Sequence, residues 1–406
     1  MLKKFPVIRF FLLSLFLFFL FSNSSQAVEL SFSWTPNSDT NLAGYKIYYG
    51  SASRSYTVAI NVGNPAIIDG KVTYKVKDLP AGQTFYFAAT AYDTTGLESD
   101  YSAEIVCTSP TAVKNDFSGD GKADVLLRNT GSGQFWMYEM NGATITNSND
   151  VGTLDSAWQA ADIADFTRDG KADILLRHTY LGQLWLYTMN GNVVTDSKEV
   201  GALSLDWKVS ATADLTGDGK ADILLRNRTT GQIWLYTMNG ASITAIQNVG
   251  ALNLLWKIAG VADFSGDGKA DILLRNSDTG QLWLFTMNGN TISSSLNVGG
   301  LSLDWEVSAS SDMTGDGKAD ILLRNIATGQ LWLYAMNGNT IIASLNIGAL
   351  NPAWSIVKVS DFTGDRKSDL LLRDNMTGQL WLNTMNGNII VAGQSVSALS
   401  FSWAVQ

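Results

Sequence analysis

The stretch Asp116-Phe117-Ser118-Gly119-Asp120-Gly121-Lys122-Ala123-Asp124 occurs six times, with small changes, in this chain of 406 residues. The interval between successive copies is always 49 residues, and the leading aspartates are Asp116, Asp165, Asp214, Asp263, Asp312 and Asp361. A constant interval without insertions indicates a structural unit that contacts mainly its neighbours, as in solenoids and propellers. We therefore expect the repeat to determine the fold.

Each copy places carboxylates at loop positions 1, 5 and 9, a hydroxyl at position 3 and, in most copies, glycine at position 6. Three like charges in a short loop repel one another unless a cation lies among them. Oxygen ligands of this kind suit calcium, whereas zinc prefers His or Cys. Position 7 would contribute its backbone carbonyl, with its lysine side chain in water. The sequence predicts up to six Ca²⁺ ions, with these ligands: Asp116, Ser118, Asp120, Lys122, Asp124; Asp165, Thr167, Asp169, Lys171, Asp173; Asp214, Thr216, Asp218, Lys220, Asp222; Asp263, Ser265, Asp267, Lys269, Asp271; Asp312, Thr314, Asp316, Lys318, Asp320; Asp361, Thr363, Asp365, Lys367, Asp369.

The residues after the loop exclude the helical calcium loop of an EF-hand. That loop needs Glu at position 12, where this chain has Leu127, and a helix on each side. Here the loop leads into the apolar run 125–128. The pattern D-x-[ST]-x-D-G-x-x-D before a strand, at a period near 50, resembles the FG-GAP or VCBS repeats of integrin-type β-propellers. The resemblance covers residues 113–406 and implies one calcium per loop, held between two strands.

The amino terminus has the pattern of a secretory signal peptide. Basic residues Lys3, Lys4 and Arg9 precede a short apolar run over 10–21, and Ala27 ends a small-residue cleavage site. The run is shorter than the roughly 20 residues of a membrane span. We predict a signal peptide over 1–27, no membrane span after cleavage, and a protein that is secreted or located at the cell surface or in the periplasm; an uncleaved anchor is the alternative.

The formal net charge of −9 is concentrated in the repeated loops, which contain 18 of the 37 acidic residues. This balance argues against nucleic acid as a partner, because no basic stripe is present. The single cysteine, Cys107, excludes an intrachain disulfide framework. We expect Cys107 to be a buried strand residue, with a thiol available for cross-linking as the alternative.

Residues 28–108 lack the repeat and alternate in hydrophobicity with period two, as in Leu30, Phe32 and Trp34. Several such runs separated by turn signals favour a small antiparallel sandwich. The stretch 79–87, with Trp34 upstream, resembles a fibronectin type III domain. The family's corner tyrosine falls at Phe85, so its hydroxyl bond is missing unless Tyr86 replaces it. Residues 109–112 read as a linker.

Each repeat contains four strand signals, which in the first copy are 123–128, 134–140, a run after Asn141-Gly142, and the stretch after Trp158. Asn-Gly between apolar runs is a strong hairpin signal, and four antiparallel strands make one propeller blade. Twelve tryptophans at two fixed phases are expected in the core between blades. Residues 401–406 supply the strand start that the first copy lacks. We therefore predict an all-β chain: a fibronectin type III sandwich, then a six-bladed calcium-binding propeller over 113–406. An open array is the alternative.

The six loops differ in two ways that should affect metal binding. Copy six has Arg366 where the other copies have glycine, so its β-carbon must tolerate left-handed geometry beside a positive charge. Copy two has Arg168 at position 4, where the others have glycine. We expect the sixth site to be the weakest and the second to be perturbed.

Polar residues at fixed phase inside the repeats are candidate ligand contacts. The strongest candidates are Arg128, Gln134, Trp136, Arg226, Gln232 and Trp234. One interpretation is structural, with each arginine stacked on tryptophan and bonded to carbonyls of the next blade. The other is a glycan pocket repeated between blades, which resembles propeller lectins in architecture only.

Catalytic motifs are missing from the sequence. The only histidine, His178, occupies a phase where most copies have Asn, and neither a G-x-S-x-G elbow nor a Walker loop occurs. We expect a non-catalytic adhesion or ligand-binding protein whose partner is a glycan or an extracellular protein. An enzyme acting on polysaccharide, or an accessory protein to one, and a purely structural surface or matrix component are the alternatives.

Overall fold

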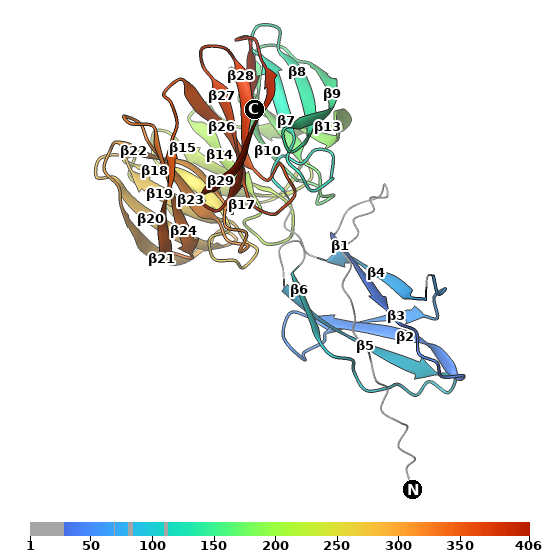
Figure 1. The fold of residues 1–406 in the computed structure, drawn as a ribbon. Coiled ribbons are helices and arrows are strands. Elements are labelled where there is room, and N and C mark those ends of the chain that lie inside the picture. Colours follow the sequence, from blue (N-terminus) through green and yellow to red (C-terminus); the bar gives the residue numbers. More distant parts are fainter. Residues whose placement is uncertain (1–27, 69, 80–83, 109–112) are drawn as a thin grey trace. The chain divides into compact units, whose positions relative to one another are not determined.

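The computed structural model describes residues 28–68, 70–79, 84–108 and 113–406, and every regular element in them is a β-strand. The predicted signal peptide and the linker lie outside the described residues. The chain divides into two compact units, 1–111 and 112–406, shown in Figure 1. Within the described residues, the search for a helix of membrane-spanning length and hydropathy finds none.

The first unit contains two antiparallel sheets that enclose one core. Its strands are β1 (Val28–Trp34), β2 (Leu42–Gly50), β3 (Val58–Gly63), β4 (Val72–Leu79), β5 (Thr84–Asp93) and β6 (Ile105–Thr108). One sheet pairs β1 with β4, and the other has the order β3-β2-β5-β6. The predicted alternation is confirmed for Leu30, Phe32 and Trp34, which are all buried in the shared core. Cys107 is buried in β6, as expected.

The second unit contains six four-stranded antiparallel sheets, which we number 1 to 6. In sheet order, the strands are β30 (Trp403–Val405), β7 (Val125–Asn129), β8 (Gln134–Asn141), β9 (Thr144–Thr153); β10 (Trp158–Ala164), β11 (Asp173–His178), β12 (Gln183–Asn190), β13 (Val193–Ala202); β14 (Trp207–Ala213), β15 (Asp222–Asn227), β16 (Gln232–Asn239), β17 (Ser242–Ala251); β18 (Trp256–Ala262), β19 (Asp271–Asn276), β20 (Gln281–Asn288), β21 (Thr291–Gly300); β22 (Trp305–Ser311), β23 (Asp320–Asn325), β24 (Gln330–Asn337), β25 (Thr340–Ala349); β26 (Trp354–Ser360), β27 (Asp369–Asp374), β28 (Gln379–Asn386), β29 (Ile389–Ala398). The four strands predicted for each repeat are thus present.

The strand connections place the aspartate loops at one end of every sheet. In sheets 2 to 6 the loop joins the first strand to the second, and in sheet 1 it leads into the second strand, β7. The Asn-Gly turn between the third and fourth strands lies at the same end. The turn glycines, such as Gly191 with φ 59°, occupy the left-handed region that these tight turns require. The other end of each sheet carries the remaining two connections, for example 179–182 and 203–206.

Backbone hydrogen bonds tie each aspartate loop to the next sheet. The carbonyl of Asp116 accepts the amide of Ala172 at 2.6 Å, and the carbonyl of Phe117 accepts the amide of Gly191 at 2.8 Å. The same two bonds recur between all later neighbours. Because they use only main-chain atoms, they persist although the side chains at these positions vary.

The last sheet is joined to the first in the same way. Ala123 donates its amide to the carbonyl of Asp361 at 2.7 Å, and Gly142 donates to Phe362 at 2.8 Å. The carboxy-terminal strand β30 pairs with β7, with Trp403 opposite Asn129. The expected completion of the first sheet by the carboxy-terminal residues is therefore confirmed.

The twelve repeat tryptophans lie at the margins of six hydrophobic clusters, each formed between adjacent sheets. Fully buried leucine, isoleucine, methionine and phenylalanine form the centres of these clusters. The predicted packing between sheets is confirmed, although the indoles are half-buried. In sheets 2 to 6 the two tryptophans meet edge to face, as Trp158 and Trp185 do at 6.3 Å between ring centroids.

The tryptophans of the third strands differ in how their indole N–H is satisfied. In four sheets Nε1 donates to a serine twelve residues later, as Trp332 does to Ser344 Oγ at 2.7 Å. At that phase sheet 3 has Ile246, and Trp234 Nε1 is buried without a partner. An unpaired buried donor costs about 1–3 kcal/mol.

This difference predicts that Ile246→Ser stabilises the protein by about 1 kcal/mol, because Trp234 gains the hydrogen bond of its counterparts. Ile246 is 52% exposed, so little apolar burial is lost. Equilibrium urea unfolding measures the change. The reverse substitution in sheet 5, Ser344→Ile, should destabilise by a similar or larger amount, and equal effects of both variants would contradict the assignment.

Candidate metal centre

The aspartate loop of sheet 4 illustrates the geometry of all six. It runs from Asp263 at position 1 to Asp271 at position 9 and joins β18 to β19. Asp271 begins the second strand and is completely buried, as its five counterparts are to within 1% exposure. The loop therefore places a carboxylate inside the protein in each repeat.

The carboxylate at position 1 closes the loop by accepting backbone amides. Asp263 Oδ1 accepts the amide of Gly266 at 2.6 Å, and Oδ2 accepts that of Gly268 at 2.8 Å. The amides of positions 4 and 6 make the same bonds in every loop. The position-3 hydroxyl adjoins this carboxylate in five loops, with Ser265 Oγ 3.3 Å from Asp263 Oδ1.

The carboxylate at position 9 joins the loop to the hairpin of its own sheet. Asp271 Oδ2 accepts the amides of Phe264 and Ser265, at 3.0 and 2.9 Å, and Oδ1 accepts the amide of Met287 at 2.9 Å. The bond to a methionine amide sixteen residues later occurs in all six sheets. Sequence reasoning missed this role, although the fixed spacing from aspartate to methionine was a signal for it.

Positions 5 and 7 are more exposed than positions 1 and 9. Asp267 Oδ1 accepts only the amide of Lys269, at 2.9 Å, and its other oxygen lies 3.5 Å from Lys269 Nζ. The position-7 lysine side chains were predicted to extend into water, but four of their stems lie against the protein. A β-carbon at Gly266 would lie 2.9 Å from Cε of Lys318, so this stem lies across the preceding loop, and those of Lys122, Lys269 and Lys367 do the same. A lysine stem lies there because its methylene groups are buried against the glycine of the preceding loop.

Arg366 adopts the left-handed geometry predicted for it, and Arg168 adopts it too. Arg168 and Arg366 have φ of 63° and 68°, in the left-handed region that costs a residue with a β-carbon about 1–2 kcal/mol. Arg366 still donates its amide to Asp361 Oδ2 at 2.7 Å, so the loop keeps its shape. Whether these loops bind metal less well stays a prediction.

Burial dominates the electrostatics of positions 1 and 9. It raises the pKa of Asp271 to about 6, while the amide of Met287 acts in the opposite direction. Burial, followed by the neighbouring Asp124, raises the pKa of Asp116 to about 7, and burial raises that of Asp173 to about 8. All twelve carboxyls at positions 1 and 9 shift in this direction. The ion pairs that the described residues form in these loops use position 5 instead.

The donor chemistry of each loop fits a hard cation, because it consists of carboxylate, hydroxyl and carbonyl oxygens. Three or more His, Cys, Asp or Glu side chains placed to hold a metal ion are not found among the described residues. As folded, the carboxylates of positions 1 and 9 face backbone amides. The calcium ligand set therefore stays a prediction, and position 5 has the carboxylate with the fewest bonds.

The candidate arginines lie at the opposite ends of the sheets. Arg128 and Arg226 are buried, at 6% and 5% exposure, and donate to backbone carbonyls at the start of the next sheet, for example Arg226 to Asn253 at 3.2 Å. Arg128 lies over the ring of Phe135 at 5.6 Å, not over a tryptophan. These contacts support the structural interpretation over a glycan pocket at Arg128, Gln134 and Trp136 and their sheet 3 counterparts.

His178 acts as a turn residue, as predicted. Its Nδ1 accepts the amides of Tyr180 and Leu181 at 3.3 and 3.2 Å. In sheet 1, Asn129 Oδ1 accepts the amides two and three residues later in the same manner. The imidazole replaces the asparagine side chain.

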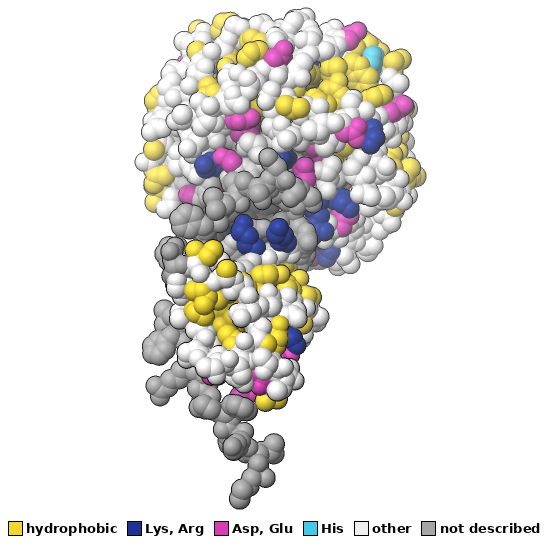
Figure 2. All heavy atoms as spheres, turned by 90° about the vertical axis from the view of Figure 1, so that its right-hand side faces the viewer, with side chains coloured by type: hydrophobic (Ala, Val, Ile, Leu, Met, Phe, Trp, Pro, Cys, Tyr) yellow, Lys and Arg dark blue, Asp and Glu magenta, His cyan; other side chains and the backbone are white. Residues whose placement is uncertain are grey.

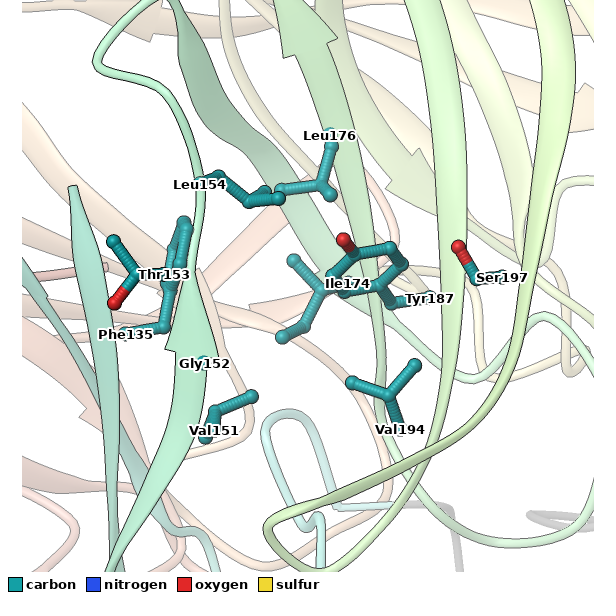
Figure 3. A pocket seen from close by; sticks show the side chains of 10 residues that line it. All are labelled: Phe135, Val151, Gly152, Thr153, Leu154, Ile174, Leu176, Tyr187, Val194 and Ser197. Carbon is teal, nitrogen blue, oxygen red and sulfur yellow. The ribbon is translucent and has the colours of Figure 1, made fainter.

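A cavity of about 160 Å³ lies between sheets 1 and 2 (Figure 3). Its lining is mostly aliphatic and aromatic, including Val151, Ile174 and Val194. Of its few hydroxyls, Ser197 Oγ already accepts Trp185 Nε1 at 2.7 Å. A sugar needs several hydrogen-bonding partners, so this cavity suits it poorly.

The raised pKa values predict how the metal-free protein responds to pH. The folded-state pKa values of these aspartates are raised above the unfolded value of about 3.9, to about 6 for Asp222, about 7 for Asp124 and about 8 for Asp173. The folded state therefore binds more protons than the unfolded state at pH values between the two pKa values. Stability should therefore increase as pH is lowered from 7.5 to 5. Urea unfolding of protein stripped of metal measures this trend, and a loss of stability over that range would contradict it. Saturating calcium should weaken or reverse the trend, because calcium requires ionised carboxylates.

The search for similar proteins gives one family and several distant structures. A family model described as FG-GAP-like repeat matches residues 116–176, 214–274, 263–323 and 312–372. Each match begins at a leading aspartate, and together they cover more than half of the chain. No curated protein matches the sequence.

The solved structures resemble the chain only distantly. Dihydro-heme d1 dehydrogenase NirN in complex with DHE is 13% identical, with a TM-score of 0.39 and coverage of 77% of this chain and 72% of that one. An oligogalacturonate lyase in complex with manganese is 10% identical, with a TM-score of 0.39 and coverage of 74% of this chain and 85% of that one. A putative 6-phosphogluconolactonase from Bacteroides uniformis is 14% identical, with a TM-score of 0.32 and coverage of 76% of this chain and 95% of that one. We infer no activity from these likenesses. The family match and the six loops establish that the chain belongs to the proteins with FG-GAP-like repeats.

Proposed function

We propose that the chain is an exported, non-catalytic binding or adhesion protein, in which a fibronectin type III module precedes a six-bladed propeller that holds calcium. The observation that carries this proposal is the buried, repeated carboxylate. In all six loops the aspartate at position 9 is buried, and the pKa values of positions 1 and 9 are raised. The ion pairs of Lys122, Lys220 and Lys269 are made with position 5. A divalent cation is the partner that would compensate this charge in every repeat.

The six-bladed architecture is supported by the bonds between sheets. Every sheet has four antiparallel strands, and the same backbone bonds connect each sheet to the next and the sixth to the first. First strands of successive sheets also lie beside one another, as β10 and β14 do. This is the arrangement expected of blades around a common axis.

The fibronectin type III assignment is supported by the strand order of the first unit. A two-stranded sheet, β1-β4, faces a four-stranded sheet, β3-β2-β5-β6, across one core. Trp34 lies in that core against Tyr45, with ring centroids 5.2 Å apart. The buried Phe85 occupies the position of the family's corner tyrosine.

A ligand-binding face is supported by exposed apolar side chains at the sheet ends opposite the aspartate loops. Tyr180 and Met376 are 77% and 76% exposed in their turns, and Phe401 is 67% exposed before β30. Hydrophobic side chains also form patches on the face of the larger unit shown in Figure 2. Exposed patches of this kind commonly mark interaction sites.

Calcium titration tests the metal part of the proposal. Calorimetry on the metal-stripped protein should show calcium uptake, with a higher unfolding temperature that excess EDTA reverses. Asp267→Asn should lower the stoichiometry by one ion and change metal-free stability little, because Asp267 accepts only one amide. Asp271→Asn is the matched control: it disturbs three amide bonds and should destabilise by about 1–3 kcal/mol with or without calcium. An absence of calcium uptake would refute the metal part.

Glycan and extracellular-protein arrays, probed with and without chelator, test the binding part. We expect Tyr180→Ser to weaken binding about tenfold, as loss of a central aromatic contact does. Ile342→Ser, at an exposed position on the outer strand β25, is the control and should bind normally. Equal losses in both variants would contradict the location of the face, and an absence of any bound glycan or protein would contradict the binding function.

A further inference from the structure

The sixfold repeat is broken at one phase of the first strands. Four residues after the tryptophan that begins the first strand, sheets 3, 4 and 5 have the small residues Ala211, Gly260 and Ala309. At the same phase sheet 2 has Asp162 and sheet 6 has Lys358. Repetition does not explain these two charges.

The two charged side chains belong to one cluster at the junction of sheets 6, 1 and 2. Lys358 Nζ donates to Asn115 Oδ1 at 3.2 Å. Lys114, the residue before Asn115, places its Nζ 3.8 Å from Asp162 Oδ1. Ser360 fixes this segment by donating its hydroxyl to the Lys114 carbonyl at 2.6 Å. Two ammonium groups and one carboxylate therefore lie close together where the ends of the repeat region meet.

The cluster has an excess of positive charge. Asp162 is already bonded by two backbone amides, those of Ile163 at 2.9 Å and Thr212 at 2.7 Å, so its negative charge is shared among several donors. Burial, followed by the charge of Lys114, lowers the pKa of Lys358 to about 8, and Asp162 only partly opposes this. One positive charge has no matching negative charge among the groups that act on Lys358.

The cluster also contains a buried donor without a partner. Asn115 is 1% exposed, and its Nδ2 makes no hydrogen bond, although Oδ1 of the same amide contacts Lys358. Its φ of 68° is left-handed, which fixes the backbone at this point. Because Lys358 occupies the amide oxygen, Nδ2 remains a buried donor without an acceptor in the protein.

We propose that Lys358, Lys114 and Asn115 form a binding site for a small oxyanion at the junction of the sixth and first sheets. Two ammonium groups and an amide N–H match the acceptor oxygens of a sulfate, a phosphate or a carboxylate. The side chain of Lys114 is 54% exposed, so an ion can enter from solvent beside it. A bound anion would neutralise the excess charge and strengthen the closure of the ring.

Isothermal titration calorimetry on the full chain tests this site. Sodium sulfate and sodium acetate are the probes, each compared with sodium chloride at equal ionic strength, which removes general screening effects. We expect saturable binding of at least one probe. Sulfate binding alone would identify a tetrahedral anion site, acetate binding alone a carboxylate site, and an absence of binding by both would overturn the proposal.

Substitutions then locate the site. Lys358→Met keeps the length of the side chain and removes the charge, and it should weaken binding about tenfold or more, as the loss of a charged hydrogen bond does. Asn115→Gly tolerates the left-handed backbone and removes the amide, so it provides a second test if Lys358→Met does not fold. Lys198→Met is the control, because Lys198 is an exposed residue of β13 that pairs with Asp196. Full binding in Asn115→Gly, or an equal loss in Lys198→Met, would also overturn the proposal.

Discussion

The larger unit depends on one interaction, the acceptance of backbone amides by a buried carboxylate. Asp271 and its counterparts have no contact with water, yet each joins the loop before it to the hairpin after it. Neutral side chains of similar size offer fewer acceptor sites than the two oxygens of a carboxylate. The price of this arrangement is burial of an ionisable group, which appears as the raised pKa.

The loop that this carboxylate shapes also connects neighbouring sheets. The carbonyls of loop positions 1 and 2 accept amides from the next sheet, so a change in the loop conformation would disturb two sheets at once. In a row of repeats, the terminal units lack one neighbour and are the weakest. Here the sixth sheet bonds to the first, and β30 completes the first sheet, so both terminal units have neighbours. The stability of the larger unit therefore depends on contacts between its first residues, near 113, and its last residues, near 406.

Much of this organisation could be predicted from the sequence. The period of 49 predicted the unit, the Asn-Gly pairs predicted the hairpins, and residues 401–406 were expected to supply the strand start that the first copy lacks. Side-chain contacts across sheets could not be predicted, because they depend on which repeat faces which. The lysine stems lie over glycines of the preceding loop, and Lys358 meets Asn115, 243 residues away. The role of position 9 was missed for another reason: repeated aspartates suggest metal, and the bond to Met287 leaves no charge pattern in the sequence.

Amide acceptance and calcium binding suit different aspartates of the same loop. An ionised carboxylate has about four lone-pair sites. Asp271 uses three for amides and has little capacity left, whereas Asp267 uses one for the Lys269 amide. Position 9 is thus suited to shaping the loop, and position 5 is suited to a cation. A cation bound near position 5 would also favour the ionised form of the buried carboxylates, whose pKa values burial raises. Metal binding would in this way reinforce the acceptance of amides on which the fold depends.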